Sequence, residues 1–532
     1  MKKMLALLLA LCFMLTAASC GAGNSTSGAG GAASGNPTGS GGGSTAAPVA
    51  QDDAHEVIRI AVGREIKALD GEYGANVGFN PYLHIFDPLV AANSNSEIVE
   101  SLATSWERID DTAWEFTLRE GVKFHDGSDF TAADVKYTFD RIATEDPKFN
   151  YAGNWGQAWP PETEIVDDYH VIIRYQTPQP LFLLLLPRIG ILPEGAVEAN
   201  PDFFTTGLIG TGAYTFDSWD IGNTGRITLQ SNPNYWGGQP DIETLIYEAV
   251  PNASARALAF QNGEYDYVFE LPYDQIDSIA AMLGVRVETK DTVNLNYVVL
   301  NPIPQENGAN AFVTDPNFRK ALIYAVDHEP LAQALTAGYS HSIEGLGYPF
   351  TKGYRATGAY PERDVEKAKE LLNASSYAGQ TVRIYCSTGQ FYNDVTILEA
   401  IKTQLEEVGI TCSLEEVDSG TWKTIRTAHE YEIGVNNGGT TIGDASFYYT
   451  QNRTTFGFST PECEDILTKM ADPSLTDAQY TEMIGDLLET FMESDPFVWV
   501  ATCPYVYAMN DGLSNVGFLS WGCPLFHDAE LN

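Results

Sequence analysis

The chain has 532 residues, and 71 acidic against 30 basic residues give it a formal net charge of −41 at pH 7. A negative charge of this size disfavours nucleic acid and anionic membrane surfaces as partners. The apolar content of 44%, with 11% aromatic residues, is typical of a globular protein with a large core. The composition thus predicts a folded protein of two or three domains that does not bind nucleic acid.

The N-terminus has the features of an export signal. Lys2 and Lys3 precede an apolar run over residues 4–15, which is shorter than the ~20 residues that a bilayer span needs. Small residues then lead to Cys20, an arrangement similar to a lipobox, in which cleavage precedes a cysteine that carries a lipid. We predict a lipoprotein signal peptide over residues 1–19 and lipidation of Cys20. The alternative is an ordinary secretory signal with a chance cysteine.

A segment rich in glycine and serine follows, over residues 20–54. Such a sequence behaves as a flexible coil, and roughly 30 residues of it have a root-mean-square span of about 30 Å. No later apolar run has the length of a membrane span, and the run over residues 181–186 closes at Pro187. We therefore expect an extracytoplasmic protein, anchored to the cell membrane by its lipid through this tether.

A local pattern over residues 114–142 predicts a strand, a turn and a helix. Residues 114–119 alternate between apolar and polar side chains, as a half-buried strand does. Residues 125–128, His-Asp-Gly-Ser, are typical of a turn. Thr131 follows as a helix N-cap, and apolar residues recur at helical spacing from Val135 to Ile142.

A β-α-β unit is predicted further along the chain. Residues 382–386 and 410–414 alternate as strands, and apolar residues between 398 and 408 share one helical face. Gly409 stands where a C-cap glycine ends a helix. Strands mixed with helices in this way indicate an α/β protein with a parallel crossover.

Several segments resemble the motifs of the family 5 extracellular solute-binding proteins, the receptors of dipeptide, oligopeptide and nickel ABC importers. The matching segments are LATSW at 102–106, LREGVKFHDG at 118–127, TAADVKYTF at 131–139, GTGAYTF at 210–216, NPNYW at 232–236, residues 253–266, residues 317–327 and DVEKAKELL at 364–372. Ala213 departs from the proline of the family pattern. The motif around residues 118–139 is expected to serve the fold rather than the ligand.

The resemblance implies an α/β, two-lobed periplasmic-binding-protein-like fold of type II, with an extra subdomain in lobe one. It assigns residues 57–84, 207–295 and 497–532 to lobe one, 85–206 to the extra subdomain, and 296–496 to lobe two. The chain would cross between the lobes near residues 295 and 497, and these crossings would act as a hinge around a ligand cleft.

Nothing in the sequence indicates catalysis. The chain lacks G-x-S-x-G, H-E-x-x-H and the phosphate-binding G-x-x-x-x-G-K, and its eight histidines are scattered. No enzyme activity, cofactor or metal is therefore expected. Five cysteines follow the signal segment; Cys503 and Cys523 either pair or remain free thiols.

The function implied is that of a membrane-tethered, monomeric receptor that captures a peptide or similar small solute and delivers it to an ABC permease. One alternative is a secreted, lipid-anchored hydrolase that uses two carboxylates, whose separation a sequence does not reveal. Another is a receptor for an oligosaccharide or a metal complex instead of a peptide.

The candidate ligand contacts come from positions matched to the family. Peptide receptors of the family hold the ligand's ammonium on an aspartate in a lobe-two loop, where this chain has Thr440, and it has Asn437 in place of the family's tryptophan. Asp444 is the charged residue of this loop. The predicted ligand-binding residues are Asn76, Val77, Asn436, Asn437, Thr440, Asp444 and Tyr505. The two asparagines and the threonine suit amide or hydroxyl groups of a solute, or serve a plain turn.

Replacing Cys20 by alanine is expected to abolish lipid attachment, because the sulfur that carries the lipid is lost. Wild-type protein should fractionate with membranes and be released by detergent, whereas Cys20→Ala should appear in the medium or keep its signal peptide. Membrane fractionation with intact-mass measurement checks this. A Cys20→Ala protein that is processed normally and still needs detergent for release would contradict the anchor.

Overall fold

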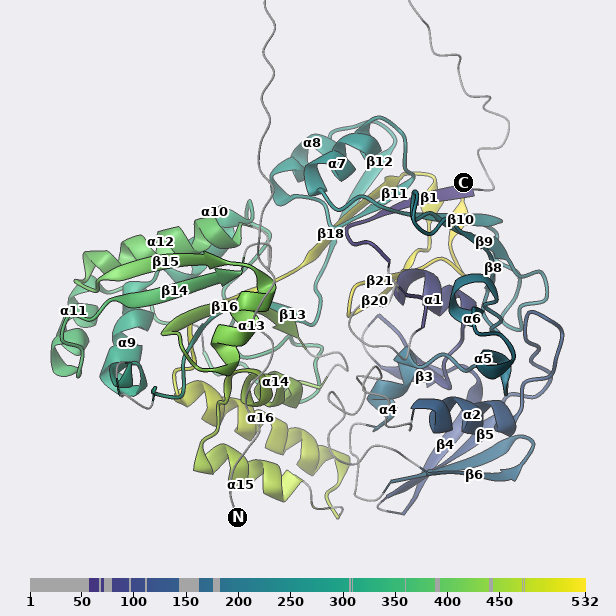
Figure 1. Cartoon of the computed structure of the whole chain (residues 1–532), viewed down its shortest axis with the longest axis horizontal. Helices are drawn as coiled ribbons and strands as arrows, with labels where there is room; N and C mark the ends of the chain where they lie inside the picture. Colours follow the sequence, from purple (N-terminus) through teal and green to yellow (C-terminus); the bar gives the residue numbers. More distant parts are fainter. Residues whose placement is uncertain are drawn as a thin grey trace, which may run out of the picture. The chain divides into compact units, whose positions relative to one another are not determined.

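A computed structural model describes the folded part of the chain with gaps. The described residues are 57–66, 68–70, 79–94, 97–110, 112–142, 162–175, 182–305, 308, 310–358, 360–387, 393–439, 444–470, 472 and 474–532. They form two large β-sheets, each covered by helices, and one smaller antiparallel sheet (Figure 1).

The first large sheet has seven strands in the order β12-β18-β11-β1-β10-β9-β8. Its central strand, β1, pairs in parallel with β10 and β11 and carries apolar residues on both faces. The strands are β1 (Val57–Val62), β8 (Tyr214–Trp219), β9 (Ile227–Ser231), β10 (Thr244–Ala249), β11 (Tyr267–Phe269), β12 (Val285–Lys290) and β18 (Tyr505–Asn510). Helices α1 (Phe79–Ile85), α7 (Ala253–Gln261) and α8 (Ile276–Ala280) contact this sheet. We call this unit lobe one.

The second large sheet has five strands in the order β15-β14-β16-β13-β17. These are β13 (Asn294–Leu300), β14 (Val382–Ser387), β15 (Cys412–Val417), β16 (Ile433–Gly439) and β17 (Phe497–Thr502). One face packs on α9 (Pro316–Ala325), α10 (His328–Leu335), α11 (Val365–Ala374) and α12 (Asp394–Glu407), the other on α13 (Ser419–Thr427), α14 (Ser446–Phe456), α15 (Pro461–Met470) and α16 (Asp477–Glu493). We call this unit lobe two. The predicted β-α-β unit is confirmed, since β14, α12 and β15 follow in order and the two strands pair in parallel.

The smaller sheet has four strands, β4 (Ala103–Asp110), β5 (Ala113–Leu118), β6 (Glu162–Asp167) and β7 (His170–Arg174), and packs with α2 (Ala132–Ile142). The strand, turn and helix predicted from residues 114–142 are confirmed in β5 and α2. Thr131 caps α2, where its Oγ1 accepts from the Ala133 backbone N–H at 3.3 Å.

The motif around His125 joins the four-stranded sheet to lobe one. The His125 backbone N–H donates to Gly210 O at 2.9 Å, and the ring Nε2 lies 3.0 Å from Gly212 O. Gly210 itself leaves no room for a side chain, because a Cβ there would lie 2.0 Å from Ile85 O. These contacts support the expectation that this motif serves the fold.

Shorter elements complete the described fold. They are β2 (Val90–Ala92), β3 (Ile98–Glu100), α4 (Phe182–Leu185), η2 (Leu186–Arg188), α5 (Ala196–Ala199), α6 (Phe203–Thr206), η3 (Tyr273–Gln275), η4 (Ala311–Thr314), β19 (Leu513–Ser514), β20 (Gly517–Leu519), β21 (Cys523–Leu525) and β22 (Glu530–Leu531). No helix among the described residues is long and apolar enough to cross a membrane. Cys503 and Cys523 are both free thiols.

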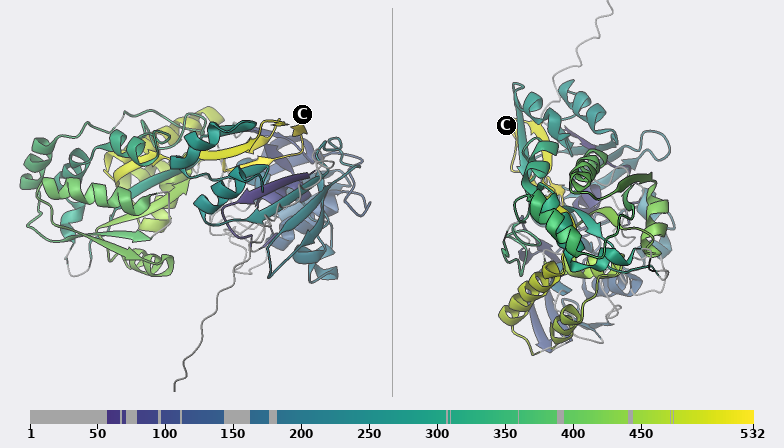
Figure 2. Two further views of the ribbon diagram at one scale, coloured as in Figure 1. Left: turned by 90° about the horizontal axis from the view of Figure 1, so that it is seen from above. Right: turned by 90° about the vertical axis from the view of Figure 1, so that its left-hand side faces the viewer.

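Two neighbouring strands carry the chain between the sheets. β12 continues into β13, and β17 continues into β18, so that β12 pairs with β18 in one sheet and β13 with β17 in the other, both antiparallel. In Figures 1 and 2 the yellow β18 lies beside the teal strands of lobe one. The second crossing lies at Cys503 and Pro504, later than the expected position near residue 497, because β17 belongs to the lobe-two sheet.

The two crossings are tied to each other by partly buried hydrogen bonds. Thr292 Oγ1 donates to Cys503 O at 3.0 Å. The Tyr348 hydroxyl donates to Asn294 O at 2.7 Å and accepts from the Cys503 backbone N–H at 3.0 Å. Tyr348 thus joins both strands where they leave the lobe-two sheet.

Tyr348→Phe is expected to destabilise the protein by about 1–3 kcal/mol, because two backbone groups lose their hydrogen-bond partner. Urea unfolding followed by circular dichroism should show a lower midpoint than wild type. Tyr324→Phe is the matched control, since no hydrogen bond to its hydroxyl is present among the described residues. Equal midpoints for Tyr348→Phe and wild type would contradict the role of the hydroxyl.

Candidate functional site

A cavity of about 660 Å³ lies where the chain crosses between the lobes. Lobe one contributes residues of the segments 63–64, 251–256 and 270–273, lobe two contributes Asn296, Thr336 and Asn437, and the second crossing contributes 503–506. The volume is typical of a site for a small molecule. We call this cavity the interlobe cleft.

Arg256 holds the backbone of the lobe-one wall in place. Its side chain is 2% exposed. Its Nε donates to Phe269 O at 2.7 Å, Nη1 donates to Val250 O at 2.6 Å, and Nη2 donates to Glu270 O. Burial lowers the pKa of this guanidinium. Because its donors are used by carbonyls of its own lobe, Arg256 shapes the wall rather than offering a free charge to a ligand.

The lobe-two wall carries a pair of neutral amides. Asn296 of β13 and Asn437 of β16 are cross-strand partners, and Asn437 Nδ2 donates to Asn296 Oδ1 at 2.6 Å. The same nitrogen lies 3.7 Å from Cys503 Sγ. Burial raises the pKa of the Cys503 thiol to about 11, so the thiol remains protonated at neutral pH. The amide groups of this wall are suited to hydrogen bonds with uncharged polar groups of a solute.

Tyr505 lines the cleft where the chain enters lobe one. Its hydroxyl accepts from Asn294 Nδ2 at 3.2 Å, and its ring meets Phe269 edge to face with centroids 4.9 Å apart. A Cβ at Gly522 would lie 1.9 Å from the Tyr505 ring. Burial, together with the negative charge of Glu270, raises the pKa of this phenol. The ring is therefore held firmly by its surroundings.

The structure brings together only some of the predicted ligand-binding residues. Asn437 and Tyr505 line the interlobe cleft. Asn436 points to the opposite face of the sheet, where its Nδ2 donates to the Tyr297 hydroxyl at 2.7 Å. Asn76, Val77, Thr440 and Cys20 lie outside the described residues.

Asp444 lies away from the interlobe cleft and is fully buried. Its Oδ1 accepts from the Ser446 backbone N–H at 2.8 Å and from Ser446 Oγ at 2.6 Å, at the start of α14. A contribution of Asp444 to ligand binding stays a prediction, and the described contacts indicate a role in the turn that precedes this helix.

Three charged residues of the cleft, Arg64, Arg256 and Glu270, were missed by the sequence interpretation. Arg64 follows β1 with an exposed side chain, and Glu270 follows β11. Arg64 and Glu270 could have been found from their positions just after two neighbouring parallel strands, because the ends of such strands lie at the same edge of a sheet. Glu270 is the one carboxylate among the described residues that line the cleft.

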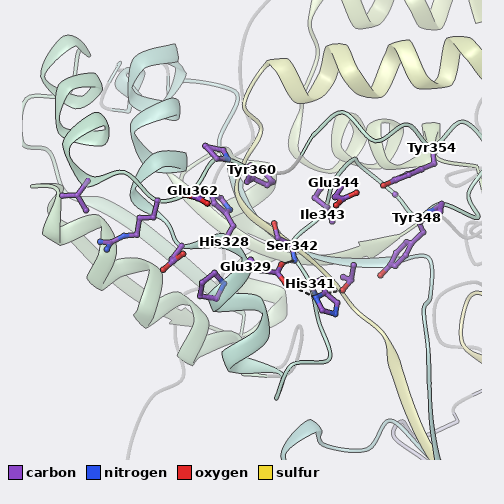
Figure 3. Close-up of a pocket in the computed structure, with 18 residues that line it drawn as sticks. His328, Glu329, His341, Ser342, Ile343, Glu344, Tyr348, Tyr354, Tyr360 and Glu362 are labelled. Carbon is purple, nitrogen blue, oxygen red and sulfur yellow. Dashed lines mark hydrogen bonds and ion pairs between the residues drawn. The ribbon is translucent and has the colours of Figure 1, made fainter.

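A second cavity, of about 920 Å³, lies within lobe two near α10 and the segment 341–365 (Figure 3). At its centre, Glu329 accepts from the Ser342 backbone N–H at 2.6 Å and lies 3.0 Å from His341 Nδ1. His328 stacks on Tyr360 with centroids 4.2 Å apart, and burial lowers the pKa of His328 to about 4. This cavity takes its described lining from lobe two and the end of β17, so a hinge motion would leave it largely unchanged.

Comparison with known families decides the class of the protein. The family model for the bacterial extracellular solute-binding proteins, family 5, middle region, matches residues 97–460. The chain belongs to this family. The match spans parts of both lobes and the four-stranded sheet, and family 5 proteins are extracytoplasmic binding proteins rather than enzymes.

Individual relatives agree with this assignment. The glutathione-binding protein GsiB of Salmonella typhimurium is 26% identical over 370 residues, covering 68% of this chain and 69% of GsiB. The substrate-binding protein CtaP of an ABC transporter of Listeria monocytogenes is similar in structure, with a TM-score of 0.79, 20% identity and coverage of 90% and 99%. DppA of Helicobacter pylori in complex with the peptide STSA gives a TM-score of 0.74 at 21% identity, with the same coverage. These structures confirm the α/β two-lobed periplasmic-binding-protein fold.

Proposed function

We propose that the protein is the membrane-tethered receptor of an ABC importer, and that it captures a small solute in the interlobe cleft and delivers it to the permease. The observation that carries this proposal is the position of the cleft, whose lining comes from both lobes and from the strands that join them. A solute held there contacts both lobes at once and so favours their closed arrangement. Lipidation of Cys20 would keep the receptor at the membrane. The receptor is proposed to act as a monomer.

A peptide or similar amide-containing molecule is the proposed solute class. Asn296 and Asn437 present amide groups that match peptide or hydroxyl groups. GsiB is named for glutathione, a tripeptide, and DppA was solved with a peptide. An oligosaccharide is a second candidate, because neutral amides bind hydroxyl groups equally well.

The hydrolase alternative finds little support in the cleft. A glycosidase of the usual kind needs two carboxylates about 5–9.5 Å apart. The described lining of the cleft contains Glu270 alone. A pair of carboxylates around a substrate is therefore not formed by the residues that the structure describes there.

A panel of solutes tests binding and turnover together. The panel contains glutathione, di-, tri- and tetra-alanine, raffinose and a nickel–histidine complex, each at saturating concentration. One class should raise the melting temperature, since a ligand at a hundredfold excess over Kd stabilises by about 2.7 kcal/mol. Mass spectrometry should recover the bound solute unchanged after overnight incubation. Conversion of the bound solute to a product, or no stabilisation by any solute class, would contradict the proposal.

A further inference from the structure

Glu270 occupies an unusual backbone position at the edge of the interlobe cleft. It follows β11 with a φ of +57°, in the left-handed region that residues other than glycine rarely adopt. A residue in this conformation is strained and persists only where its surroundings hold it, often at a ligand site. Here Arg256 supplies that hold, because its guanidinium binds the carbonyl oxygens on both sides, those of Phe269 and Glu270.

The neighbouring strand leaves space for the Glu270 carboxylate. Gly63 directly follows β1 and lines the cleft. A Cβ added to Gly63 would lie 2.1 Å from Glu270 Oε2. The carboxylate therefore lies directly against a residue with no side chain. Among the described residues, no hydrogen bond and no ion pair reaches either carboxylate oxygen. The fold thus places a negative group in the cleft and leaves its acceptor positions available.

The rest of the cleft supports a complementary charge on the solute. The facing wall of lobe two carries the neutral amides of Asn296 and Asn437. Of the two arginines in the lining, Arg256 donates its hydrogen bonds to carbonyl groups and still acts on Glu270 through its charge, and Arg64 is exposed with no ion pair to Glu270 within 4 Å. A carboxylate with available acceptor positions binds a cationic group through charge-assisted hydrogen bonds, which are about twice as strong as neutral ones.

We propose that Glu270 binds a primary ammonium or guanidinium group of the solute from lobe one. The proposal rests on the proposed receptor function and adds the residue that selects the solute's charge. Lobe two then contributes hydrogen bonds from neutral amides, and Glu270, directly after β11, binds the cationic end of the solute. An anionic solute would instead be drawn to Arg64.

Three variants separate this role from a structural one. Glu270→Gln keeps the size of the side chain and removes the charge. Glu270→Gly removes the side chain and suits the positive φ, so the unliganded protein should melt at the same or a higher temperature. Gly63→Ala keeps the charge but displaces the flexible carboxylate from its position. Glu264→Gln, an exposed carboxylate outside the cleft, is the control for net charge.

The probe is a tryptic digest of casein, offered as prepared and after acetylation of its amines, and mixed with neutral oligosaccharides. Protein unfolded and refolded to remove carried solute is incubated with each pool, and retained solutes are identified by mass spectrometry. Wild type and Glu264→Gln should retain amine-bearing solutes from the untreated digest and, from the acetylated one, only peptides that contain arginine. Glu270→Gln, Glu270→Gly and Gly63→Ala should retain roughly 10- to 100-fold less.

The outcomes distinguish the two proposals. If wild type retains acetylated peptides that lack arginine equally well, or only oligosaccharides or anions, the protein is a receptor and the role of Glu270 is wrong. The same holds if Glu270→Gln retains amine-bearing solutes as wild type does. If wild type retains nothing from either pool, the receptor proposal fails and the role of Glu270 fails with it.

Discussion

The paired crossing of β12–β13 and β17–β18 is the constraint on which the arrangement of the site depends. In each crossing the chain leaves a strand of one sheet and enters a strand of the other, so two neighbouring chain segments connect the lobes. Backbone pairing in both sheets and the hydroxyls of Thr292 and Tyr348 keep the two crossings side by side. A pair of short extended segments flexes by small changes in backbone dihedrals, which suits a hinge. The interlobe cleft lies at these crossings, because Cys503, Pro504 and Tyr505 line it.

The two walls of the cleft differ in their chemistry because they come from different kinds of structure. The lobe-two wall is regular sheet, where Asn296 and Asn437 sit opposite each other and satisfy each other in part. The lobe-one wall is formed by chain that leaves the ends of strands, where Arg256 gathers several carbonyl groups and holds Glu270 in a strained conformation. In the proposed receptor role, rigid neutral groups on one side and a positioned charge on the other would together supply affinity and selection.

Local patterns allowed much of the fold to be predicted, and the site much less. The helix after Thr131 and the β14–α12–β15 unit were predicted correctly because capping and apolar spacing act within a short stretch. The sheet to which β17 belongs could not be predicted, because this strand is buried on both faces and periodicity then carries no information about its neighbours. The second crossing was placed too early for the same reason.

Three features of the site could not be predicted from the sequence, each for a different physical reason. Adjacent strand residues face opposite sides, so only one of Asn436 and Asn437 reaches the cleft, and the pattern does not say which. Asp444 precedes Ser446 in an arrangement typical of a local turn, and its contacts follow that signal. The positive φ of Glu270 has no signature in the sequence, because it depends on the distant contact with Arg256.

Closure of the lobes around a solute is the central claim, and small-angle X-ray scattering tests it most directly. The radius of gyration should be measured for the solute-free protein and for the protein saturated with a solute that stabilises it in the thermal assay. The account predicts a smaller radius with solute, because a ligand that contacts both walls of the cleft binds the closed state better. An unchanged radius at proven saturation would contradict it.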